Sequence, residues 1–583
     1  MTSLGSSVLQ WTDYVVVGIV LSISTGIGIY YRFSGGRQKT AEEYFSANRS
    51  MSIIPLAIAL MVSFMSAITL LGISAEVYTR GTQFTMFYVG FAFGTPIVAH
   101  FYLPVFWELQ TKSVFEYLEK RFGSTSRMVA SIANSLQLIL YTGVVLYAPS
   151  LALEATTGLS GTMSILLIGI ICTFYSTIGG IKAVLITDVF QGFLMFAALF
   201  AVLGVATYEL DGELSQVWEI SEKGRRIEFF DFRFDPTIRH TWWGLTIGGM
   251  CVFISLYGTN QVQIQRLLTV KSLTAARVSL YLNWPLMIGL CFLTVFSGLV
   301  LYTVYHNCDP VASGMISSYD KIMPYFAAER LSKFPGLTGL FVSGVFSASL
   351  STISAVLNSL SAIAVEDYLK PFYNKKDEEL SDARATLFGK IIAITIGFIC
   401  LAIAFLVGNF GSLVQATIAV SAAFNGPLLG IFTLGMFTEQ ANEKGAVIGL
   451  LTAISFMMWI ILGTPKPPLS PLPVTTEGCN FTIAGNNTSI LSAGITGEKS
   501  FYFYLYRISY MWYSPIGLTI TMVVGYLASV AIRKISQETI PEPDPSLLTP
   551  FLAARIRKRS SKPTKMASSQ DFILESNDQL SRY

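Results

Sequence analysis

Two clusters of hydroxyl side chains lie inside apolar segments of the sequence. The segment from Ser347 to Ser354 holds five serine or threonine residues among eight positions, and the segment from Ser63 to Thr69 holds three. Neutral hydroxyl and carbonyl oxygens bind a dehydrated sodium ion without the desolvation penalty of a buried carboxylate. Ser66 and Thr69 stand one helical turn apart and share a face. These patterns predict a site for a monovalent cation.

The same hydroxyls have a second interpretation. Serine and threonine in membrane helices also bond to the carbonyl four residues earlier, and small residues let helices pack closely. For the Ser63–Thr69 segment taken alone this structural interpretation is the stronger one. The density of hydroxyls in the Ser347–Ser354 segment favours a cation site.

Asp188 is the plainest charged residue within an apolar segment. A carboxylate inside a membrane-spanning helix is a functional candidate, because burying its charge is costly. Its place near the start of the segment also allows a structural role, in which it caps the first turn of its own helix beside Lys182. The sequence is compatible with both interpretations.

The sequence lacks the residue patterns that a transition-metal site, ATP hydrolysis or catalysis would need. The six cysteines contain no C-x-x-C pair and the three histidines are scattered, so no metal other than sodium is expected. No phosphate-cradling G-x-x-x-x-G-K-[ST] loop is present, nor any set of nucleophile, base and orienting residue. We therefore expect neither an enzyme nor a cofactor, and we expect an ion gradient to supply the energy for active transport.

The elements that must position these residues are membrane helices. Hydrophobic residues make up 52% of the 583 positions and charged residues 13%, roughly half the ~25% of soluble domains. Uncharged stretches have the length needed to cross a hydrocarbon core of ~30 Å. The net charge of +3 and the absence of a basic stripe exclude nucleic acid as a partner. The sequence predicts an all-α polytopic protein in a lipid bilayer.

The apolar runs predict about thirteen transmembrane helices. They are expected at 14–31, 51–72, 84–107, 127–153, 160–178, 183–207, 241–260, 277–305, 336–365, 387–407, 411–437, 444–463 and 511–532. Lysine and arginine gather in the connectors 32–49, 112–127, 266–277 and 370–390, which are cytoplasmic by the positive-inside rule. The amino terminus is then extracellular, the tail is cytoplasmic, and the protein is expected in the plasma membrane.

One connector on the extracellular side carries further signals. Asn480, Asn486 and Asn487 each begin a glycosylation sequon there, which agrees with the orientation. Cys308 and Cys479 lie in connectors of the same oxidising compartment, where a disulfide can form. Whether they pair depends on their distance in space, which the sequence leaves open.

Six stretches of the sequence resemble the sodium/solute symporter family over nearly the whole chain. The resemblance is to the branch of the sodium/iodide, sodium-coupled monocarboxylate and sodium-dependent multivitamin transporters. The stretches are Ser63–Gly72, Tyr141–Pro149, Gly179–Val184 with Thr187–Gln191, Tyr257–Arg266, Leu350–Ser354 with Val365–Asp367, and Gly426–Gly430. Together they identify the family, although any one of them would be weak evidence.

The resemblance implies a LeuT-like core of two inverted five-helix repeats, with the site at their interface. The repeats are expected at 51–207 and 241–437. Around them lie the extracellular terminus with the first span and its cytoplasmic connector (1–50), an extracellular connector (208–240), two additional spans with a glycosylated loop (438–532), and a disordered cytoplasmic tail (533–583).

The resemblance also implies roles for individual residues. The main sodium site would use backbone oxygens of Val62, Met65 and Ala348 and the hydroxyls of Ser351 and Thr352. A second ion or substrate-linked site maps to Ser66, Thr69 and Tyr141. The pocket walls map to Phe64, Phe87, Tyr88, Phe91 and Phe253, for which helix packing is the alternative. Asp188 would lie on the route by which the ion leaves.

The resemblance implies sodium-coupled import of a small organic anion, a monocarboxylate or a carboxylate vitamin such as biotin or pantothenate. An iodide or other inorganic anion symporter is the alternative, but Thr69 stands where the iodide transporter has glutamine. The Ser66–Thr69 run favours a monocarboxylate, whereas Tyr141–Leu153 and Phe346–Ser354 resemble the multivitamin transporter more. A sodium-permeable channel or a solute sensor on the same fold is the remaining class, although no filter loop or charged pore ring is present.

Overall fold

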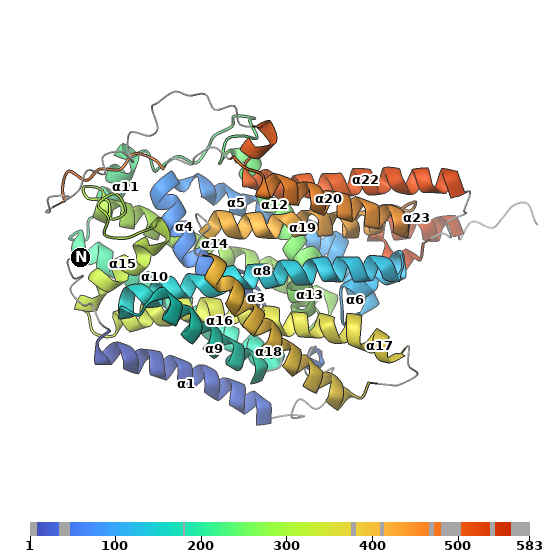
Figure 1. Cartoon of the computed structure of the whole chain (residues 1–583), viewed down its shortest axis with the longest axis horizontal. Coiled ribbons are helices and arrows are strands. Elements are labelled where there is room, and N and C mark those ends of the chain that lie inside the picture. The colour runs from blue at the N-terminus through green and yellow to red at the C-terminus, as the bar shows by residue number, and fades with distance from the viewer. Residues whose placement is uncertain are drawn as a thin grey trace, which may run out of the picture.

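The computed structural model describes residues 9–33, 47–178, 181–374, 380–407, 413–465, 471–479, 503–536 and 543–560. Within these ranges every regular element is a helix, apart from one isolated β-bridge between Met51 and Val270. The long helices lie side by side along the long axis of the molecule, with α1 on one side of the bundle and α20 and α22 on the other (Figure 1). An all-α polytopic fold was predicted from the sequence and is confirmed.

The long helices overlap the predicted apolar runs. They are α1 (Trp11–Phe33), α3 (Ile53–Phe64) with α4 (Ala67–Arg80), α5 (Met86–Ile97) with α6 (Leu103–Leu109), α8 (Ser124–Thr157), α9 (Gly161–Ile178), α10 (Ile181–Glu209), α12 (Trp242–Gly258), α14 (Leu273–Tyr305), α16 (Leu337–Ile363), α18 (Asp382–Val407), α19 (Leu413–Phe437), α20 (Glu443–Leu462) and α22 (Tyr513–Ser536). In the described residues nine helical segments are long and apolar enough to cross a membrane, one bent pair makes a tenth, and three apolar helices are shorter. The number of spans therefore stays a prediction.

Short helices occupy the connectors. They are α7 (Phe115–Arg121), α11 (Leu214–Lys223), α13 (Gln261–Leu267), α15 (Ile322–Glu329), α17 (Lys370–Asn374) and α23 (Pro550–Ser560). Helices α11 and α15 lie at one end of the bundle, and α6, α17 and α23 lie at the other (Figure 1). The two ends thus carry different sets of connectors.

The tail corrects one expectation. Residues 533–583 were predicted to be disordered, but α22 continues to Ser536 and α23 packs against the protein. Arg557 pairs with Glu108 and Arg559 with Glu439, while Ile556 is buried. The prediction failed for 543–560 because this polar segment also holds apolar side chains, such as Leu548 and Ile556, that are buried against the helix bundle.

Two of the helical segments are broken near the middle of the bundle. Helices α3 and α4 meet at an angle of 58°, and Ser66 begins α4 by accepting a hydrogen bond from the Ile68 amide. Helix α12 ends at Gly258, and Asn260 begins α13 by accepting from the Val262 amide. In both places a polar side chain caps the new helix and satisfies a backbone donor that the break exposes.

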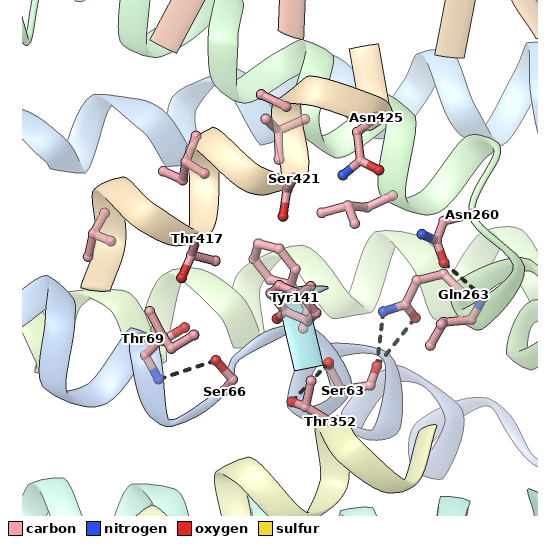
Figure 2. A pocket seen from close by; sticks show the side chains of 18 of the residues that line it. Ser63, Ser66, Thr69, Tyr141, Asn260, Gln263, Thr352, Thr417, Ser421 and Asn425 are labelled. Carbon is pink, nitrogen blue, oxygen red and sulfur yellow. Dashed lines mark hydrogen bonds between the residues drawn. The ribbon is translucent and has the colours of Figure 1, made fainter. Parts of the chain in front are cut away.

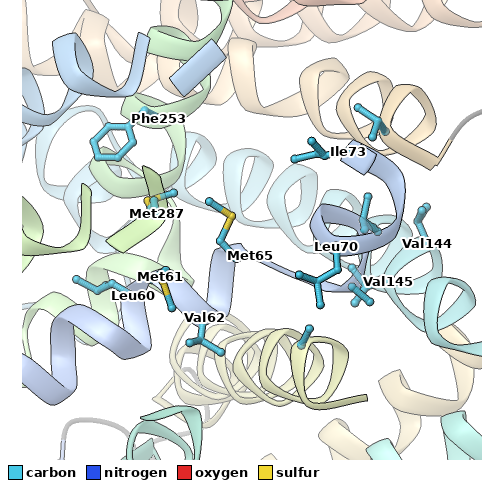
Figure 3. Packing of buried hydrophobic residues seen from close by; sticks show 14 of the residues in the cluster. Leu60, Met61, Val62, Met65, Leu70, Ile73, Val144, Val145, Phe253 and Met287 are labelled. Carbon is cyan, nitrogen blue, oxygen red and sulfur yellow. The ribbon is translucent and has the colours of Figure 1, made fainter. Parts of the chain in front are cut away.

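Apolar side chains surround the α3–α4 break and hold it in place. Leu60, Met61 and Val62 of α3 and Leu70 and Ile73 of α4 pack around it, together with Val144, Val145, Phe253 and Met287 from neighbouring helices (Figure 3). Helix α16 passes beneath the break and is buried on nearly all sides. The hydroxyls of α16 therefore face protein groups rather than lipid.

Candidate cation and solute site

The break between α3 and α4 frees two backbone carbonyls. The Ser66 amide bonds to the Phe64 carbonyl at 3.0 Å instead of the Val62 carbonyl four residues back. The Thr69 amide bonds to the Ser66 carbonyl at 2.9 Å instead of the Met65 carbonyl. Because a helix end leaves carbonyls without helical donors, the Val62 and Met65 carbonyls can accept from another group or bind a cation. These are two of the three backbone ligands implied for the sodium site.

Hydroxyls of α16 face this break. The Thr352 hydroxyl donates to the Ser63 carbonyl and to the Ala348 carbonyl, each at 3.2 Å. Ser349 and Ser354 bond instead to backbone carbonyls of Val145 and Ser351. The hydroxyl-rich segment is thus divided, since Thr352 faces the α3 terminus while Ser349 and Ser354 serve helix packing.

Asp188 lies between α16 and α13 and is fully buried. Its carboxylate accepts from the Ser351 hydroxyl at 2.5 Å and from the Arg266 guanidinium at 2.6 Å. Arg266 also donates to the Ala59 carbonyl at 2.9 Å. The interpretation of Asp188 as a cap of its own first turn is therefore wrong, because both carboxylate oxygens point to other helices.

Sequence reasoning counted Arg266 among the charges of a cytoplasmic connector and gave it no partner. It is the first charged residue after His240 and follows an entirely uncharged helix, and it is 2% exposed. An arginine buried at such a place needs a carboxylate partner. That signal, combined with the lone Asp188, could have predicted the pair.

A cavity of about 130 Å³ lies beside the break. Its polar lining residues come from α3, α4, α8, α13, α16 and α19 and from the break before α13 (Figure 2). They are Ser63, Ser66, Thr69, Gln137, Tyr141, Asn260, Gln263, Thr352, Thr417, Ser421 and Asn425. A single ordered water needs only ~10–15 Å³ of such space, so the cavity has room for a small solute.

The cavity gathers many of the implied residues. All three residues of the second ion or substrate-linked site line it, as do Thr352 and three of the aromatic residues, Phe64, Phe87 and Tyr88. Phe91 and Phe253 are not among its lining residues. Phe91 packs behind Phe64 at 5.6 Å between ring centroids, and Phe253 stacks on Tyr257 at 4.5 Å. For these two residues the alternative of helix packing is the better description.

Four amide side chains of the cavity were missed by sequence reasoning. They are Gln137, Asn260, Gln263 and Asn425. They come from three separate stretches of the chain, with Asn260 and Gln263 in the same one, so only the folded structure brings them together. The feature of the sequence that could have indicated them is an amide side chain within or beside an apolar run. This feature is too common to identify four particular residues.

A second arginine–carboxylate pair lies next to the cavity, at the far end of α4. Glu76 stands one turn beyond Ile73, which lines the cavity. The Arg239 guanidinium donates to Glu76 and to Gln415 at 2.8 Å each, and it lies 4.8 Å from the ring centroid of Tyr510. This cluster joins α4, the connector before α12, the start of α19 and the segment before α22.

Two titratable groups in the connectors lie beside this cluster. Burial lowers the pKa of His240 to about 3, against the attraction of Glu76, so its ring is neutral at physiological pH. Burial raises the pKa of the Asp320 carboxyl to about 7, the hydrogen bond from the Leu413 amide opposes this rise, and the charge of Glu76 adds to it. The immediate surroundings of Glu76 thus contain two arginines, its ion-pair partner Arg239 and the nearby Arg80, and a carboxyl that titrates near neutrality.

The connectors at this end are also linked covalently. Cys308 and Cys479 form a disulfide bond with their Cα atoms 5.0 Å apart. The other four cysteines are buried and take part in no disulfide bond within the described residues. The predicted glycosylation sites Asn480, Asn486 and Asn487 lie outside the described residues and stay a prediction.

The site is thus a cavity beside a broken helix, with freed carbonyls and facing hydroxyls. Residues 44–453 match the model of the sodium:solute symporter family. The chain belongs to this family. The family was predicted from the sequence and is confirmed, so this symporter takes sodium as its co-substrate.

Curated relatives of this symporter are transporters. It is 45% identical over 560 residues to a proposed sodium-dependent multivitamin transporter of Drosophila melanogaster, covering 94% of this chain and 92% of the relative. It is 37% identical over 546 residues to sodium-coupled monocarboxylate transporter 1 of Homo sapiens, covering 91% of this chain and 88% of the relative. The relatives thus divide between vitamin and monocarboxylate carriers.

Solved structures place the symporter in a known fold. A substrate-bound, outward-open sodium-coupled sialic acid symporter superposes with a TM-score of 0.72 at 23% identity, covering 90% of this chain and 98% of that structure. The nucleobase-cation-symport-1 transporter Mhp1 superposes with a TM-score of 0.51 at 13% identity, covering 84% and 95%. These likenesses concern the fold, and they confirm the predicted LeuT-like class.

Proposed function

We propose that this symporter imports a small organic anion together with sodium across the plasma membrane by alternating access. The observation that carries the proposal is a cavity lined by hydroxyl and amide groups, with no lysine or arginine among its lining residues. An anion entering such a cavity needs a cation to balance its charge, because an uncompensated buried charge is costly. Sodium bound next to the cavity supplies that balance.

The proposed sodium ligands are the carbonyls of Val62, Met65 and Ala348 and the hydroxyls of Ser351 and Thr352. Support comes from the two carbonyls that lack helical donors and from the Thr352 hydroxyl that faces the same helix end. Asp188 accepts the hydrogen bond of the Ser351 hydroxyl, which leaves the lone pairs of that hydroxyl oxygen for a cation. We propose that the ion leaves past Asp188.

Ser66, Thr69 and Tyr141 form the proposed second ion or substrate-linked site. All three line the cavity, and Ser66 and Thr69 belong to the first turn of α4 (Figure 2). A carboxylate at this point would approach the amino-terminal end of a helix, where backbone amides favour negative charge. A second sodium ion or the carboxylate of the solute fits this chemistry.

We further propose the inverted repeats at 51–207 and 241–437. The first span of each half is broken, at Ser66 in one and at Asn260 in the other, and both breaks border the cavity. Discontinuous helices at corresponding positions of two halves are typical of inverted-repeat transporters. With this division the amino terminus is extracellular and the tail is cytoplasmic.

The proposed cargo is a monocarboxylate or a carboxylate vitamin such as biotin or pantothenate. The name of the human relative, a monocarboxylate transporter, supports a carboxylate, and the name of the Drosophila relative supports a vitamin. The amides of Gln137, Asn260, Gln263 and Asn425 favour a solute that carries further hydrogen-bonding groups, since a buried amide left without a partner is costly. Besides the carboxylate, pantothenate has two hydroxyls and an amide and biotin has a ureido ring, whereas lactate has one hydroxyl.

Radiolabelled uptake tests the proposal directly. Cells that express the chain would be offered pantothenate, biotin, nicotinate, lactate and iodide, with sodium or with choline in the medium. We expect sodium-dependent uptake of at least one carboxylate and no uptake of iodide. Carboxylate uptake that is indifferent to sodium would refute symport, and sodium-dependent uptake of iodide alone would refute the organic cargo.

A further inference from the structure

Gln263 touches both the cavity and the end of α3. Its side chain lines the cavity, and it is 3% exposed. Its amide nitrogen donates to the Ser63 hydroxyl at 3.0 Å, and its amide oxygen lies 3.4 Å from the same hydroxyl (Figure 2). A carboxamide has two N–H donors and an acceptor oxygen, so one donor is left for a solute in the cavity.

Ser63 continues this contact to the proposed sodium ligands. Its carbonyl accepts from the Thr352 hydroxyl at 3.2 Å, while its own hydroxyl meets Gln263. Ser63 also lies next to Val62 in the last turn of α3, where the freed carbonyls are. A shift of Gln263 is therefore transmitted to the helix end that presents those carbonyls.

Helix α13 is held a second time, one turn further along. Arg266 binds Asp188, and Asp188 binds the hydroxyl of Ser351. Gln263 and Arg266 thus connect α13 to neighbouring proposed sodium ligands on α16 by two separate routes. Because α13 is seven residues long and every one of them is buried, it moves as one piece.

We propose that Gln263 is the positioning residue that couples solute binding to sodium binding. Its free amide donor contacts the solute, and its bond to Ser63 sets the α3 terminus against Thr352. A solute that fixes the side chain of Gln263 therefore also fixes the position of the sodium ligands. In the other direction, a sodium ion that fixes Ser63 holds Gln263 in the position in which it contacts the solute. This inference rests on the sodium ligands and the cargo class of the proposed function.

The coupling has a measurable size and is reciprocal. Linked binding sites typically change each other's affinity by about 5- to 150-fold. Each ligand changes the affinity for the other by the same factor, because the cycle of binding steps must close. Removing the Gln263 side chain abolishes this mutual change in affinity, while the sodium ligands stay in place.

The test is a sodium titration of the thermal stability of the purified protein in detergent. Sodium raises Tm when it binds the folded state, and the sodium concentration at half the effect reports its affinity. Each titration is run with choline as the balancing cation, without solute and with a mixture of pantothenate, biotin and lactate as potassium salts. In the unmodified protein we expect the mixture to lower the sodium midpoint by about fivefold or more.

Three variants separate the roles. Gln263→Ala is expected to keep the stabilisation by sodium alone and to lose the shift caused by the solutes. Ser63→Ala removes the same contact but keeps the Ser63 carbonyl to which Thr352 donates, so this variant should also lose the solute-induced shift of the sodium midpoint. The double variant Gln263→Ala, Ser63→Ala should lose no more than either single variant. Gln137→Ala removes another amide of the cavity that makes no hydrogen bond to Ser63. At saturating solute this variant should show the full solute-induced shift of the sodium midpoint.

The outcomes are distinguishable. A normal solute-induced shift in Gln263→Ala overturns the coupling role. If Ser63→Ala retains the solute-induced shift of the sodium midpoint, the proposed route through the Ser63 hydroxyl is wrong. If sodium stabilises the unmodified protein but the solute mixture leaves the midpoint unchanged, the cargo proposal fails instead, and the coupling fails with it.

Discussion

The two arginine–carboxylate pairs beside the cavity have the same chemistry and different surroundings. The Asp188–Arg266 pair is buried on both sides, at 0% and 2% exposed side chain, and it holds Ser351 and the α3 carbonyl of Ala59. The Glu76–Arg239 pair is 4% and 13% exposed, and Arg239 also reaches Gln415 on a neighbouring helix. The first pair is part of the interior, whereas the second closes a junction between a helix and an extramembrane connector.

This difference suggests separate tasks. A fully buried pair is costly to disturb, because loss of one partner leaves an uncompensated charge. A pair at a junction, whose arginine is 13% exposed, can part and form again at lower cost because the arginine can turn toward water. We therefore expect the Asp188–Arg266 pair to maintain the structure of the proposed sodium site, and the Glu76–Arg239 pair to govern access to the cavity.

The largest effect is expected from breaking the buried pair. Asp188→Asn leaves Arg266 without its carboxylate and should lower the free energy of unfolding by about 3–5 kcal/mol. The measurement is Tm by tryptophan fluorescence in sodium-free buffer, so that any loss of sodium binding does not contribute.

The matched control is the double variant Asp188→Asn, Arg266→Gln. It removes both charges and should recover a large part of the lost stability, because no charge is left unpaired. A double variant as unstable as the single one would show that Arg266 has another carboxylate partner and that the pair is not the source of the effect.

The next effect concerns the hydroxyl beside the buried pair. Thr352→Ala removes a proposed sodium ligand worth about 1–1.5 kcal/mol, which corresponds to about a tenfold rise in the sodium concentration for half-maximal uptake. Ser347→Ala is the matched control, since Ser347 is also buried on α16 but is not a proposed ligand. Equal effects of the two substitutions would refute the ligand assignment.

A smaller effect is expected at the junction. Glu76→Gln keeps the shape of the side chain and replaces a charge-assisted hydrogen bond by a neutral one of roughly half the strength. The loss of about 1 kcal/mol should increase the open population by about fivefold. The readout is the rate at which a membrane-impermeant thiol reagent, applied to intact cells, labels a cysteine placed at Thr417 in the cavity wall.

The control for this experiment lies in the same connector. Arg233 pairs with Asp231 and is 71% exposed, so Arg233→Ala should leave the labelling rate unchanged. Glu76→Gln should also leave the sodium midpoint unchanged, because Glu76 does not touch the proposed sodium ligands. A changed midpoint with an unchanged labelling rate would reverse the roles assigned to the two pairs.

The sequence predicted the elements well because membrane helices are determined locally. A lipid-exposed segment needs about 20 apolar residues whatever its neighbours are, so runs such as 387–407 could be identified alone. The hydroxyls of Ser351 and Thr352 stood out for the same reason, since they are dense within one segment. Phe91 and Phe253 are absent from the lining of this cavity, a distinction that the sequence could not make because a cavity wall and the layer behind it contain the same aromatic residue types.

Pairs that join distant segments were beyond the reach of the sequence. Glu76 and Arg239 are separated by 163 positions, and nothing in either local pattern names the other. The contact of Gln263 with Ser63 depends on two helix breaks that meet, which is a property of the assembled bundle. The tail helix α23 was missed because the few apolar side chains that hold it, such as Ala553 and Ile556, are buried by partners elsewhere in the chain.

The smallest expected effect is a pH dependence at the same junction. The raised pKa of Asp320, about 7, means that between its unfolded value near 3.8 and 7 the folded state binds more protons than the unfolded state. Stability therefore falls as pH rises through this window. Asp320→Asn keeps an acceptor for the Leu413 amide and removes the titrating carboxyl. The difference in Tm between this variant and the unmodified protein should therefore shift in favour of the variant as pH rises from about 5 to about 8.

The junction itself can sharpen this prediction, because the charge of Glu76 contributes to the raised pKa of Asp320. In the Glu76→Gln background Asp320 loses that repulsion, its pKa moves down toward its ordinary value, and the effect of Asp320→Asn on the pH slope of Tm becomes smaller. The Asp188→Asn background should leave the effect unchanged, since Asp188 belongs to the other pair. An equal reduction in both backgrounds would mean that the two pairs are not electrostatically separate.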